Sequence, residues 1–310
     1  MHFSLVKLTP GGHATPVNGF DDVILPVYHA LKRLGFAVEI RINAVNPQSR
    51  NIIFGSCNFP KAADAVLPRN SIVFNLEQLT ESSPWVNSAY IRHLAIFNVW
   101  DYSPRNVNFL QHKLGLSNVA CVRLGYVPEM IRLHCSCPQD VDVLFYGAIN
   151  DRRRSVLQKL TKAGVNLKSL HGTYGAARDA WIVRSKIVLN VHYYTPASLE
   201  VPRLGYLWAN KKAVLSEFGP ETERAPELAA ACRYCAYDDL VEAAADLLAD
   251  DKAREKQALA GFTAFSSVSL TDELKSIVGS RTFAVNASAG RADNLHAGLD
   301  KSLGAEWAAI

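Results

Sequence analysis

Residues 185–217 read SKIVLNVHYYTPASLEVPRLGYLWANKKAVLSE, and this stretch decides the fold class of the chain. Residues 187–191 form a short, mostly apolar and β-branched run, which is typical of a strand buried on both faces of a parallel sheet. A polar connection follows, and a helix is expected to open at Glu200 because Pro202 suits a first helical turn. Residues 212–216 predict a second buried strand. Glu200 therefore stands where a strand gives way to a helix, at the edge where open α/β sheets bind ligands.

Length and composition are those of an ordinary globular protein. The 310 residues include 49% hydrophobic and 20% charged side chains, and the chain is long enough for two domains. The net charge of +4 is mild and scattered, so it favours a small anionic ligand and does not favour nucleic acid as a partner. We find no apolar run long enough to span a bilayer and no signal-peptide pattern, so a cytoplasmic location is expected.

The six cysteines predict neither a disulfide framework nor a metal site. Cys135 and Cys137 are separated by one residue, which is closer than the two-residue spacing usual in zinc sites. Cys57 and Cys121 stand alone in apolar settings and are expected to be small buried residues. We therefore expect reduced thiols and no bound metal.

Strand-like and helix-like segments alternate along the chain in two successive halves. Expected strands cover residues 3–8, 37–42, 51–56, 71–76 and 120–124 in the first half, with a further strand contained in 94–100, and 141–146, 166–170, 187–191, 212–216 and 233–237 in the second. Helices are expected between them, including one over 223–231. This order predicts mostly parallel sheets. We divide the chain into domains 1–138 and 139–280, joined by a linker around 128–140, and a tail 281–310 rich in Ala, Gly and Ser.

The second half opens with a turn that suits phosphate groups. Gly147 allows a ligand to approach the backbone closely, and Asn150, Arg152 and Arg153 follow at the start of a helix. A helix N-terminus offers free N–H groups and a partial positive charge, and arginine adds a fork of donors. We favour a diphosphate ligand here over an exposed basic helix start that meets only water. The segment is neither a GxGxxG fingerprint nor a Walker loop, so neither a dinucleotide nor NTP hydrolysis is implied.

Further ligand-binding candidates follow the other strands of this half. Tyr174 lies between two glycines and forms either a wall for a flat base or part of a tight turn. Glu200 is favoured as an acceptor of hydrogen bonds from ribose hydroxyls over a carboxylate that only stabilises a helix end, because polar and aromatic side chains stand near it. The remaining candidates on this side are His192, Tyr194, Arg203 and Glu217.

Three strand ends of the first half carry candidates for a general base. His13 follows Gly12 on a glycine-rich turn and has the best-suited unperturbed pKa. Glu77 directly follows a buried apolar strand, where an unpartnered charge is costly. Asp101 follows the next strand, where capping of the helix that comes after it is the favoured role. The sequence leaves the choice between His13 and Glu77 open.

Together these residues resemble the GT-B glycosyltransferases, specifically the bacterial group-1-like transferases with a short second domain. The resemblance is best over residues 141–217 and extends to about residue 279, whereas the first half matches in general layout. It implies an α/β fold of two Rossmann-like domains whose mostly parallel sheets face a central cleft. The C-terminal domain would bind a nucleotide-sugar donor and the N-terminal domain an acceptor, with Gly12 and Asp101 on the acceptor side.

The resemblance also implies roles for single positions. The turn over 147–153 would face the donor diphosphate, and Glu200 resembles the carboxylate that holds the ribose of the nucleotide. Residues 216–217 look like the strand-end pair that often follows it. The paired-glutamate motif with seven intervening residues is not intact, because the position eight after Glu200 is Trp208.

The expected activity is transfer of a sugar from a nucleoside-diphosphate-sugar donor to an acceptor hydroxyl, without a metal or another cofactor, as the resemblance implies. Arg152 and Arg153 would stabilise the leaving diphosphate, and His13 or Glu77 would deprotonate the acceptor. The acceptor is open: a saccharide, a lipid-linked saccharide, a protein or another molecule. Two other functions remain open, an inactive nucleotide- or sugar-binding protein of the same fold and a nucleotide-sugar epimerase.

Overall fold

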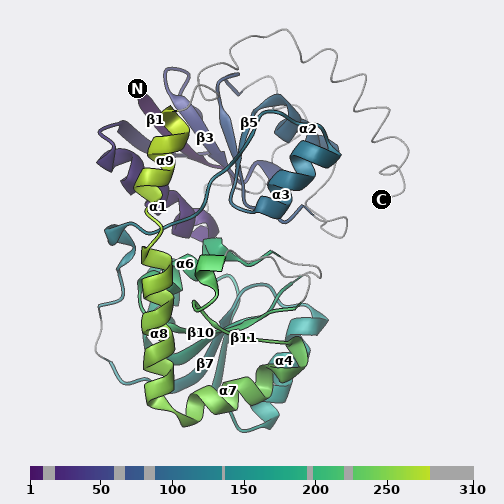
Figure 1. Cartoon of the computed structure of the whole chain (residues 1–310), viewed down its shortest axis with the longest axis vertical. Coiled ribbons are helices and arrows are strands. Elements are labelled where there is room, and N and C mark those ends of the chain that lie inside the picture. Colours follow the sequence, from purple (N-terminus) through teal and green to yellow (C-terminus); the bar gives the residue numbers. More distant parts are fainter. Residues whose placement is uncertain are drawn as a thin grey trace. The chain divides into compact units, whose positions relative to one another are not determined.

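The computed structural model describes residues 1–9, 18–58, 67–79, 88–134, 137–193, 198–219 and 226–279. The chain forms two compact units (Figure 1). Unit 1 takes residues 1–20, 30–123 and the segment from Thr271 onward, and unit 2 takes residues 21–29 and 124–270. The sequence-based boundary at residue 138 stays a prediction, and the predicted tail 281–310 lies outside the described residues.

Unit 1 is built on a six-stranded parallel sheet whose spatial order is β2-β1-β3-β4-β5-β6. The strands are β1 (His2–Lys7), β2 (Ala37–Ile42), β3 (Arg50–Phe54), β4 (Ile72–Asn75), β5 (Asn98–Asp101) and β6 (Val119–Cys121). Helices α2 (Ser88–Ile96) and α3 (Pro104–Asn108) lie in this unit, while α1 (Asp21–Arg33) and α9 (Leu270–Gly279) contain the points where the chain changes unit. The inner strands are apolar because both of their faces are buried.

Unit 2 is built on a five-stranded parallel sheet with the order β11-β10-β9-β7-β8. The strands are β7 (Val141–Tyr146), β8 (Leu167–Leu170), β9 (Ser185–Asn190), β10 (Ala213–Glu217) and β11 (Arg233–Cys235). The helices are α4 (Asp151–Lys162), α5 (Gly175–Arg184), α6 (Val201–Ala209), α7 (Leu240–Ala249) and α8 (Asp251–Ser266). The core between the sheet, α4 and α7 contains Phe145, Leu189, Leu215 and Leu247.

Helix α6 packs closely on α8 because the sequence supplies a glycine at the contact. A Cβ at Gly205 would lie 2.8 Å from the Phe265 ring, so only glycine lets the helices approach this far. The Trp208 ring lies 5.6 Å from the Phe265 ring and is fully buried. Trp208 therefore belongs to the core of unit 2, which accounts for its replacement of the second glutamate of the paired motif.

The structure confirms the α/β class and the parallel sheets, and it corrects one predicted element. The strand expected within 94–100 is β5, which begins at Asn98 because residues up to Ile96 complete α2, where Tyr90, Ile91 and Leu94 form a buried helical face. The helix expected over 223–231 is wrong within the described residues, which hold a single 3₁₀ turn at Pro226–Leu228. The proline and the short apolar pattern there support one turn and no more.

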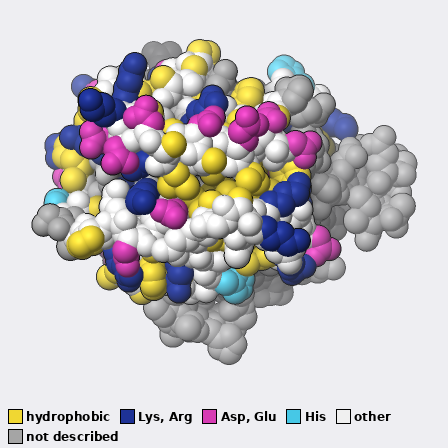
Figure 2. All heavy atoms as spheres, turned by 90° about the horizontal axis from the view of Figure 1, so that it is seen from below, with side chains coloured by type: hydrophobic (Ala, Val, Ile, Leu, Met, Phe, Trp, Pro, Cys, Tyr) yellow, Lys and Arg dark blue, Asp and Glu magenta, His cyan; other side chains and the backbone are white. Residues whose placement is uncertain are grey.

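Within the described residues no helix is both long and apolar enough to cross a membrane. The face shown in Figure 2 carries both basic and acidic side chains around a central band of hydrophobic ones. That mixture agrees with the mild net charge of +4. No single-sign field covers the described part of this face.

Candidate functional site

Strand order places a ligand crevice in unit 2 at the ends of β7 and β9. The chain leaves β7 toward β8 on one side and returns to β9 on the other side, so the direction of winding reverses between β7 and β9. In open α/β sheets such a switch point leaves a crevice beyond the carboxyl ends of the strands. Gly147 follows β7 and Asn190 ends β9, so both stand at this crevice.

The turn after β7 brings two guanidinium groups to one glycine. Gly147 has φ = 140°, a conformation that L side chains rarely adopt, and a Cβ there would lie 3.5 Å from Nη1 of Arg153 and 3.8 Å from Nη1 of Arg203. Asn150 caps α4, since its Oδ1 accepts from the Arg153 N–H at 3.0 Å. Its Nδ2 donates to the carbonyl of Tyr193 at 3.0 Å, so Asn150 fixes the loop after β9 as well.

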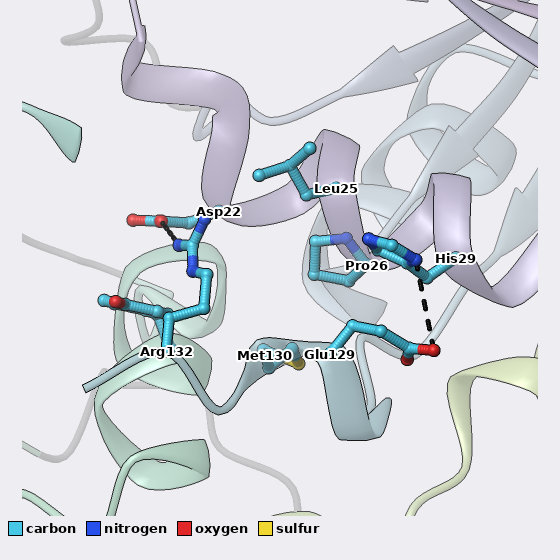
Figure 3. A pocket seen from close by; sticks show the side chains of 8 residues that line it. Asp22, Leu25, Pro26, His29, Glu129, Met130 and Arg132 are labelled. Carbon is cyan, nitrogen blue, oxygen red and sulfur yellow. Dashed lines mark hydrogen bonds and ion pairs between the residues drawn. The ribbon is translucent and has the colours of Figure 1, made fainter. Parts of the chain in front are cut away.

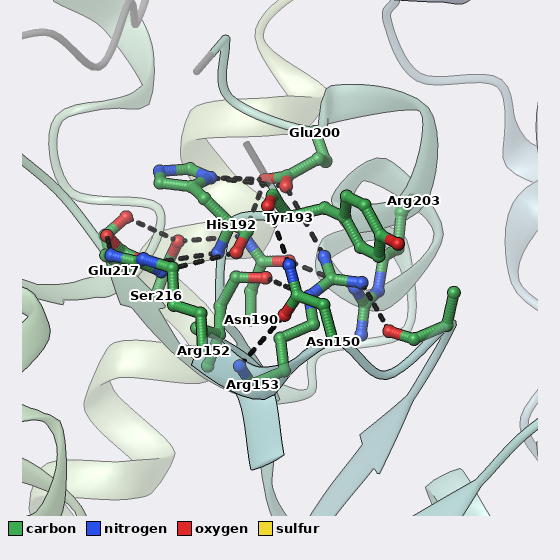
Figure 4. Close-up of polar contacts among 12 residues, drawn as sticks. Asn150, Arg152, Arg153, Asn190, His192, Tyr193, Glu200, Arg203, Ser216 and Glu217 are labelled. Atoms are coloured by element: carbon green, nitrogen blue, oxygen red, sulfur yellow. Dashed lines mark hydrogen bonds and ion pairs between the residues drawn. The ribbon is translucent and has the colours of Figure 1, made fainter. Parts of the chain in front are cut away.

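Arg152 points toward Glu217 at the end of β10 (Figure 4). Its Nη1 donates to Glu217 Oε2 at 2.6 Å, and its Nη2 pairs with the other oxygen. The guanidinium also lies 3.9 Å from the centre of the Tyr237 ring. Glu217 Oε2 further accepts from the His192 N–H at 3.0 Å. Glu217 therefore supplies the negative charge that balances the basic start of α4. Because Arg152 and Glu217 pair with each other, neither needs a ligand to balance its charge.

Glu200 is the other carboxylate of the site, and two side chains hold it. Asn190 Nδ2 donates to its Oε2 at 2.8 Å, and His192 Nδ1 lies 3.0 Å from Oε2 and 3.2 Å from Oε1. Because a carboxylate only accepts, this ring nitrogen carries the hydrogen. Burial raises the pKa of Glu200, but His192, Asn190 and Arg203 outweigh it and lower the pKa to about 2. Glu200 is therefore an anion at neutral pH.

The pKa of His192 moves in the opposite direction. Burial lowers it, but the charge and hydrogen bond of Glu200 and the charge of Glu217 outweigh burial, and the pKa is raised above 6.5. His192 is only 2% exposed and stands eight residues before Glu200. The polar partner of Glu200 is thus on the N-terminal side of it in the sequence, whereas the position eight after it is buried in the core.

Arg153 and Arg203 supply positive charge that the site does not neutralise. Arg153 is 6% exposed and donates to the carbonyls of Val191 and Ala148, both at 2.8 Å, while its nearest carboxylate oxygen, of Glu200, is 4.0 Å away. Arg203 forms an ion pair with none of the described carboxylates, and it donates to Asn190 Oδ1 at 3.2 Å. Burial lowers the pKa of Arg153 to about 10, which leaves it charged at neutral pH.

The remaining predicted residues of unit 2 are arranged less closely. Tyr174 precedes α5 and is 40% exposed, and the described residues do not decide between a base wall and a turn. His171, at the same strand end, lies 3.5 Å from the Gly147 carbonyl through Nδ1. Tyr194, like His13 and Gly12 in unit 1, lies outside the described residues.

Sequence reasoning missed two residues of this site. Asn190 is fully buried and joins Glu200 to Arg203, although its position as the polar end of an apolar run was a usable signal. Tyr237 packs on Arg152 from far along the chain, and its hydroxyl donates to the Arg152 carbonyl at 2.8 Å. No local sequence pattern predicts the contact between Tyr237 and Arg152.

Unit 1 holds the predicted acidic residues at strand ends. Glu77 follows β4 and is half-buried, and its Oε1 accepts from the Cys57 thiol at 3.5 Å. Burial raises the pKa of Glu77 despite that hydrogen bond. Asp101 is fully buried, and its Oδ1 accepts from the Ser103 N–H at 2.8 Å and the Asn106 amide at 3.2 Å. Asp101 therefore holds the start of α3, where Ser103 is the cap.

A separate small cavity in unit 2 has about 10 Å³ of space, roughly that of one water molecule (Figure 3). Asp22, His29, Glu129 and Arg132 are among its lining residues, none of which belongs to the Glu200 site. Arg132 Nη2 donates to Asp22 Oδ1 at 3.1 Å. The cavity marks an ion-paired packing contact and is too small for an organic ligand.

The described residues include no group of three or more His, Cys, Asp and Glu side chains arranged to hold a metal ion. Asp140 and Asp142 form an Asp-x-Asp pattern, but they lie at the start of β7, opposite the crevice. Asp140 accepts from Arg184 Nε and Asp142 from Lys186 Nζ, both at 2.8 Å. These two aspartates form surface ion pairs.

No protein-family model matches the chain. Curated relatives come from Acanthamoeba polyphaga mimivirus. Uncharacterized protein L137 is 28% identical over 159 residues, which is 49% of this chain and 20% of that protein. Uncharacterized protein L140 is 25% identical over 126 residues, which is 40% of each chain. The matched regions thus span less than half of these relatives, and they give no support to the bacterial source that the resemblance suggested.

Solved structures give a clearer likeness. WaaG, a glycosyltransferase involved in lipopolysaccharide biosynthesis, matches with a TM-score of 0.56 and 12% identity over 89% of this chain and 98% of that one. AviGT4, a glycosyltransferase involved in avilamycin A biosynthesis, matches with a TM-score of 0.57 and 11% identity, over 93% of this chain and 99% of that one. The DNA-modifying enzyme β-glucosyltransferase has been solved with and without its substrate uridine diphosphoglucose. It matches with a TM-score of 0.54 and 11% identity, over 92% of this chain and 100% of that one. The chain has the GT-B fold.

Proposed function

We propose that this chain is a glycosyltransferase that moves a sugar from a nucleoside-diphosphate-sugar donor to an acceptor hydroxyl. The fold alone does not select this activity, because one fold supports many functions. The proposal therefore rests on the Glu200 site of unit 2, and the structural neighbours that act as glycosyltransferases agree with it.

The observation that carries the proposal is the excess of positive charge beside Gly147, where Arg153 and Arg203 share Glu200 as their nearby carboxylate. Arg152 and Glu217 neutralise each other, and His192 and Glu200 form a second pair. Arg153 and Arg203 remain, with one carboxylate oxygen at 4.0 Å from Arg153. Arg153 is buried and Arg203 is half-buried, and a charge removed from water is costly unless it is paired. Two such guanidinium groups beside a backbone without a side chain therefore favour an anionic ligand. A diphosphate matches that charge and the fork geometry of arginine.

The remaining groups of the site suit the rest of a nucleotide. Glu200 keeps lone pairs beyond the hydrogen bonds that it accepts from Asn190 and His192, so ribose hydroxyls can donate to it. The β-glucosyltransferase neighbour has uridine diphosphoglucose as its substrate, which is a donor of this class. We assign Gly147, Arg153 and Arg203 to the diphosphate and Glu200 to the ribose.

The reaction is a substitution at the anomeric carbon of the donor sugar. The acceptor oxygen forms a bond to that carbon, the bond from the carbon to the diphosphate oxygen breaks, and the hydroxyl proton passes to a base. Arg153 and Arg203 would stabilise the charge that develops on the leaving diphosphate, as a metal ion does in other transferases. We assign the base to Glu77, since burial raises its pKa toward the range in which a carboxylate removes a proton well.

A thermal-shift screen tests donor binding first. We expect one of UDP, GDP, dTDP or CMP to raise the melting temperature, because a ligand that binds only the folded chain must stabilise it. The shift should persist in EDTA if arginines alone hold the diphosphate. No shift with any nucleotide or nucleotide sugar would refute the assignment of the Glu200 site.

A turnover experiment then separates a transferase from a binding protein. Release of the nucleoside diphosphate from the stabilising sugar conjugate is measured with pooled acceptors, for the natural chain and for Glu77→Gln. The variant should bind the donor equally and lose about 100-fold or more in rate, the usual contribution of a general base. Donor binding without turnover in either chain would favour the inactive binding protein.

A further inference from the structure

Asn190 stands at the last position of β9 and is fully buried, yet its side chain touches two groups that we assign to the donor. We propose that Asn190 is a positioning residue that locks Glu200 and Arg203 into one preassembled donor-binding unit. This inference rests on the proposed function, because Glu200 and Arg203 form one binding unit only if the ribose and the diphosphate that they contact belong to one ligand.

The amide of Asn190 has one possible orientation. Its Nδ2 donates to Glu200 Oε2 at 2.8 Å and to Ser216 Oγ at 3.1 Å, and its Oδ1 accepts from Arg203 Nη1 at 3.2 Å. Glu200 can only accept and Arg203 can only donate, so an amide turned by 180° would face each with the wrong group. The two partners therefore fix the amide, and the amide fixes them in return.

The sheet holds this amide more firmly than a loop could. Asn190 pairs with Ser216 in the register of β9 and β10, and both residues are fully buried. Glu200, in contrast, is the N-cap of α6, and its side chain makes no cap hydrogen bond to that helix. Arg203 otherwise donates to the Leu189 carbonyl at 3.4 Å and lies 4.4 Å from the centre of the Tyr146 ring. Asn190 thus ties side chains from the start of α6 to the most rigid part of unit 2.

The neutral amide also keeps both charges available to a ligand. Glu200 and Arg203 form no ion pair within 4.0 Å in the described structure. A direct salt bridge between them would use up the carboxylate and the guanidinium. Asn190 satisfies one hydrogen-bonding position on each and keeps them apart at a fixed spacing, so the remaining positions can meet a ribose and a diphosphate. Preorganisation of this kind increases affinity because less order is lost on binding.

Asn190→Asp tests the inference because it changes one donor atom into a charged acceptor of the same size. A carboxylate at this position would repel Glu200 and pair with Arg203, which separates the two donor-binding groups. We expect UDP affinity at about pH 7.5 to fall about 50-fold, in the range for lost hydrogen bonds to charged groups. Ser216→Ala removes the third hydrogen bond of the amide and the bond that Ser216 Oγ donates to the Glu217 carbonyl at 3.1 Å, but it leaves both bonds to Glu200 and Arg203. Its affinity should stay within about 3-fold of that of the natural chain.

A pH titration distinguishes positioning from general damage. When the carboxylate introduced by Asn190→Asp takes up a proton at about pH 5.5, its hydroxyl can donate to Glu200 again, because two close carboxylates raise the pKa of one of them. The affinity ratio between the natural chain and Asn190→Asp should therefore shrink about tenfold between about pH 7.5 and about pH 5.5. A ratio that does not change with pH, or Asn190→Asp binding equal to that of the natural chain, would overturn the inference.

Two controls keep the outcomes separate. If Asn190→Asp does not fold at neutral pH, Asn190→Ala is measured instead, with near-UV circular dichroism as the check on packing. UDP affinity should then fall by about tenfold or more, and unchanged affinity would overturn the inference. If the natural chain binds neither UDP nor another nucleoside diphosphate, the proposed function itself fails. If the natural chain binds and the Asn190 variants bind equally well, only the positioning role fails.

Discussion

Glu200 and His192 shift the pKa of each other, and these shifts make the stability of the fold depend on pH. The pKa of Glu200 is lowered from 4.5 to about 2, so its stabilising contribution is complete above 4.5 and is lost as pH falls through about 2. The pKa of His192 is raised above 6.5, so its contribution is complete below 6.5 and is lost as pH rises through the raised value. The pair therefore stabilises the fold fully between about pH 4.5 and 6.5.

Thermal unfolding of the natural chain and of His192→Gln checks this expectation. The difference in melting temperature should be largest inside that pH window and should shrink as the medium becomes alkaline, because neutral imidazole keeps the hydrogen bond from Nδ1 but loses the attraction between opposite charges. Glu200→Gln serves as the control, since it removes the partner and with it the alkaline loss. A difference that stays constant from acid to alkaline pH would contradict the coupling.

Arg203 is the residue at which ligand binding and stability should separate most clearly. Arg203 has no ion-pair partner within 4.0 Å among the described residues, but its charge lowers the pKa of Glu200 and its Nη1 donates to Asn190 Oδ1 at 3.2 Å. Arg203→Met should therefore lower the free energy of unfolding of the ligand-free protein by only about 1 kcal/mol, the usual cost of one lost hydrogen bond. UDP affinity should fall about 10- to 100-fold, as for the loss of charged hydrogen bonds. Calorimetric titration gives the affinity.

Arg154→Ala is the matched control for Arg203→Met. Arg154 lies two positions from Arg152 in the same helix, is exposed and pairs with Asp151 at 2.5 Å on the surface. Its removal should change neither affinity nor stability measurably. Equal affinity losses in both variants would mean that general positive charge attracts the nucleotide, and Arg203 would lose its assigned role.

Much of this site could be predicted from the sequence, because the ends of buried strands are marked by the ends of apolar runs. Glu200, Glu217 and the turn at Gly147 follow apolar runs, and parallel strands bring their carboxyl ends to one edge of a sheet. The sequence did not predict which of these residues pair with each other. Arg152 reaches Glu217 across 65 positions of the sequence, and only the order of strands brings them together. Asn190 ends an apolar run, which was a usable signal of position, but its contacts with Glu200 and Arg203 leave no mark in the sequence.

At the scale of elements, helix α6 shows why the missing glutamate at position 208 is not a damaged site. Trp208 faces the core of unit 2: its ring packs on Phe265, and a Cβ at Gly261 of α8 would lie 3.0 Å from it. The helix begins at Val201, so residue 208 is about two turns from Glu200 and on the face that meets α8. Restoring the motif there would place a charge in the core.

Trp208→Glu should therefore unfold unit 2 and not improve activity. Loss of a buried indole and burial of an unpaired carboxylate together should cost more than about 4 kcal/mol. Leu259→Glu on α8 is the control, because Leu259 is 54% exposed and the change should cost less than about 0.5 kcal/mol. Urea unfolding followed by tryptophan fluorescence and circular dichroism measures both. A stable Trp208→Glu variant with higher transfer activity would contradict this view of α6.

The segment before β5 shows where sequence patterns lose precision. The strand expected within residues 94–100 begins at Asn98, because Tyr90, Ile91 and Leu94 bury a helical face in unit 1 and carry the helix to Ile96. Tertiary burial decides between helix and strand in such short apolar runs. The strand over residues 141–146 was predicted to the residue, because its apolar run is short and polar residues and a glycine flank it.

At the scale of the whole molecule, the two units interleave along the chain. Residues 21–29 belong to unit 2, although most of the first 123 residues belong to unit 1. Within unit 2, Asp22 Oδ2 accepts from Arg178 Nη1 at 2.5 Å, and both side chains are at most 8% exposed. Burial lowers the pKa of Arg178, but Asp22 outweighs this and raises it above its ordinary value. A division of the chain at residue 138 would separate these partners.

A fragment of residues 139–280 should therefore fail to unfold cooperatively on heating. It lacks Asp22 and the segments 21–29 and 124–138 of unit 2, while Arg178 keeps Asp179 as a carboxylate partner at 3.0 Å. Loss of the buried pair between Asp22 and Arg178 alone costs about 3–5 kcal/mol, a large part of the stability of a domain. In the full chain, Asp22→Asn should lower the free energy of unfolding by about the same amount. Asp151→Asn, which breaks only the exposed pair with Arg154, should lower it by less than about 1 kcal/mol. Circular dichroism melts and urea unfolding measure all three. A 139–280 fragment that melts cooperatively near the temperature of the full chain would establish the sequential division and show that residues 21–29 contribute little to unit 2.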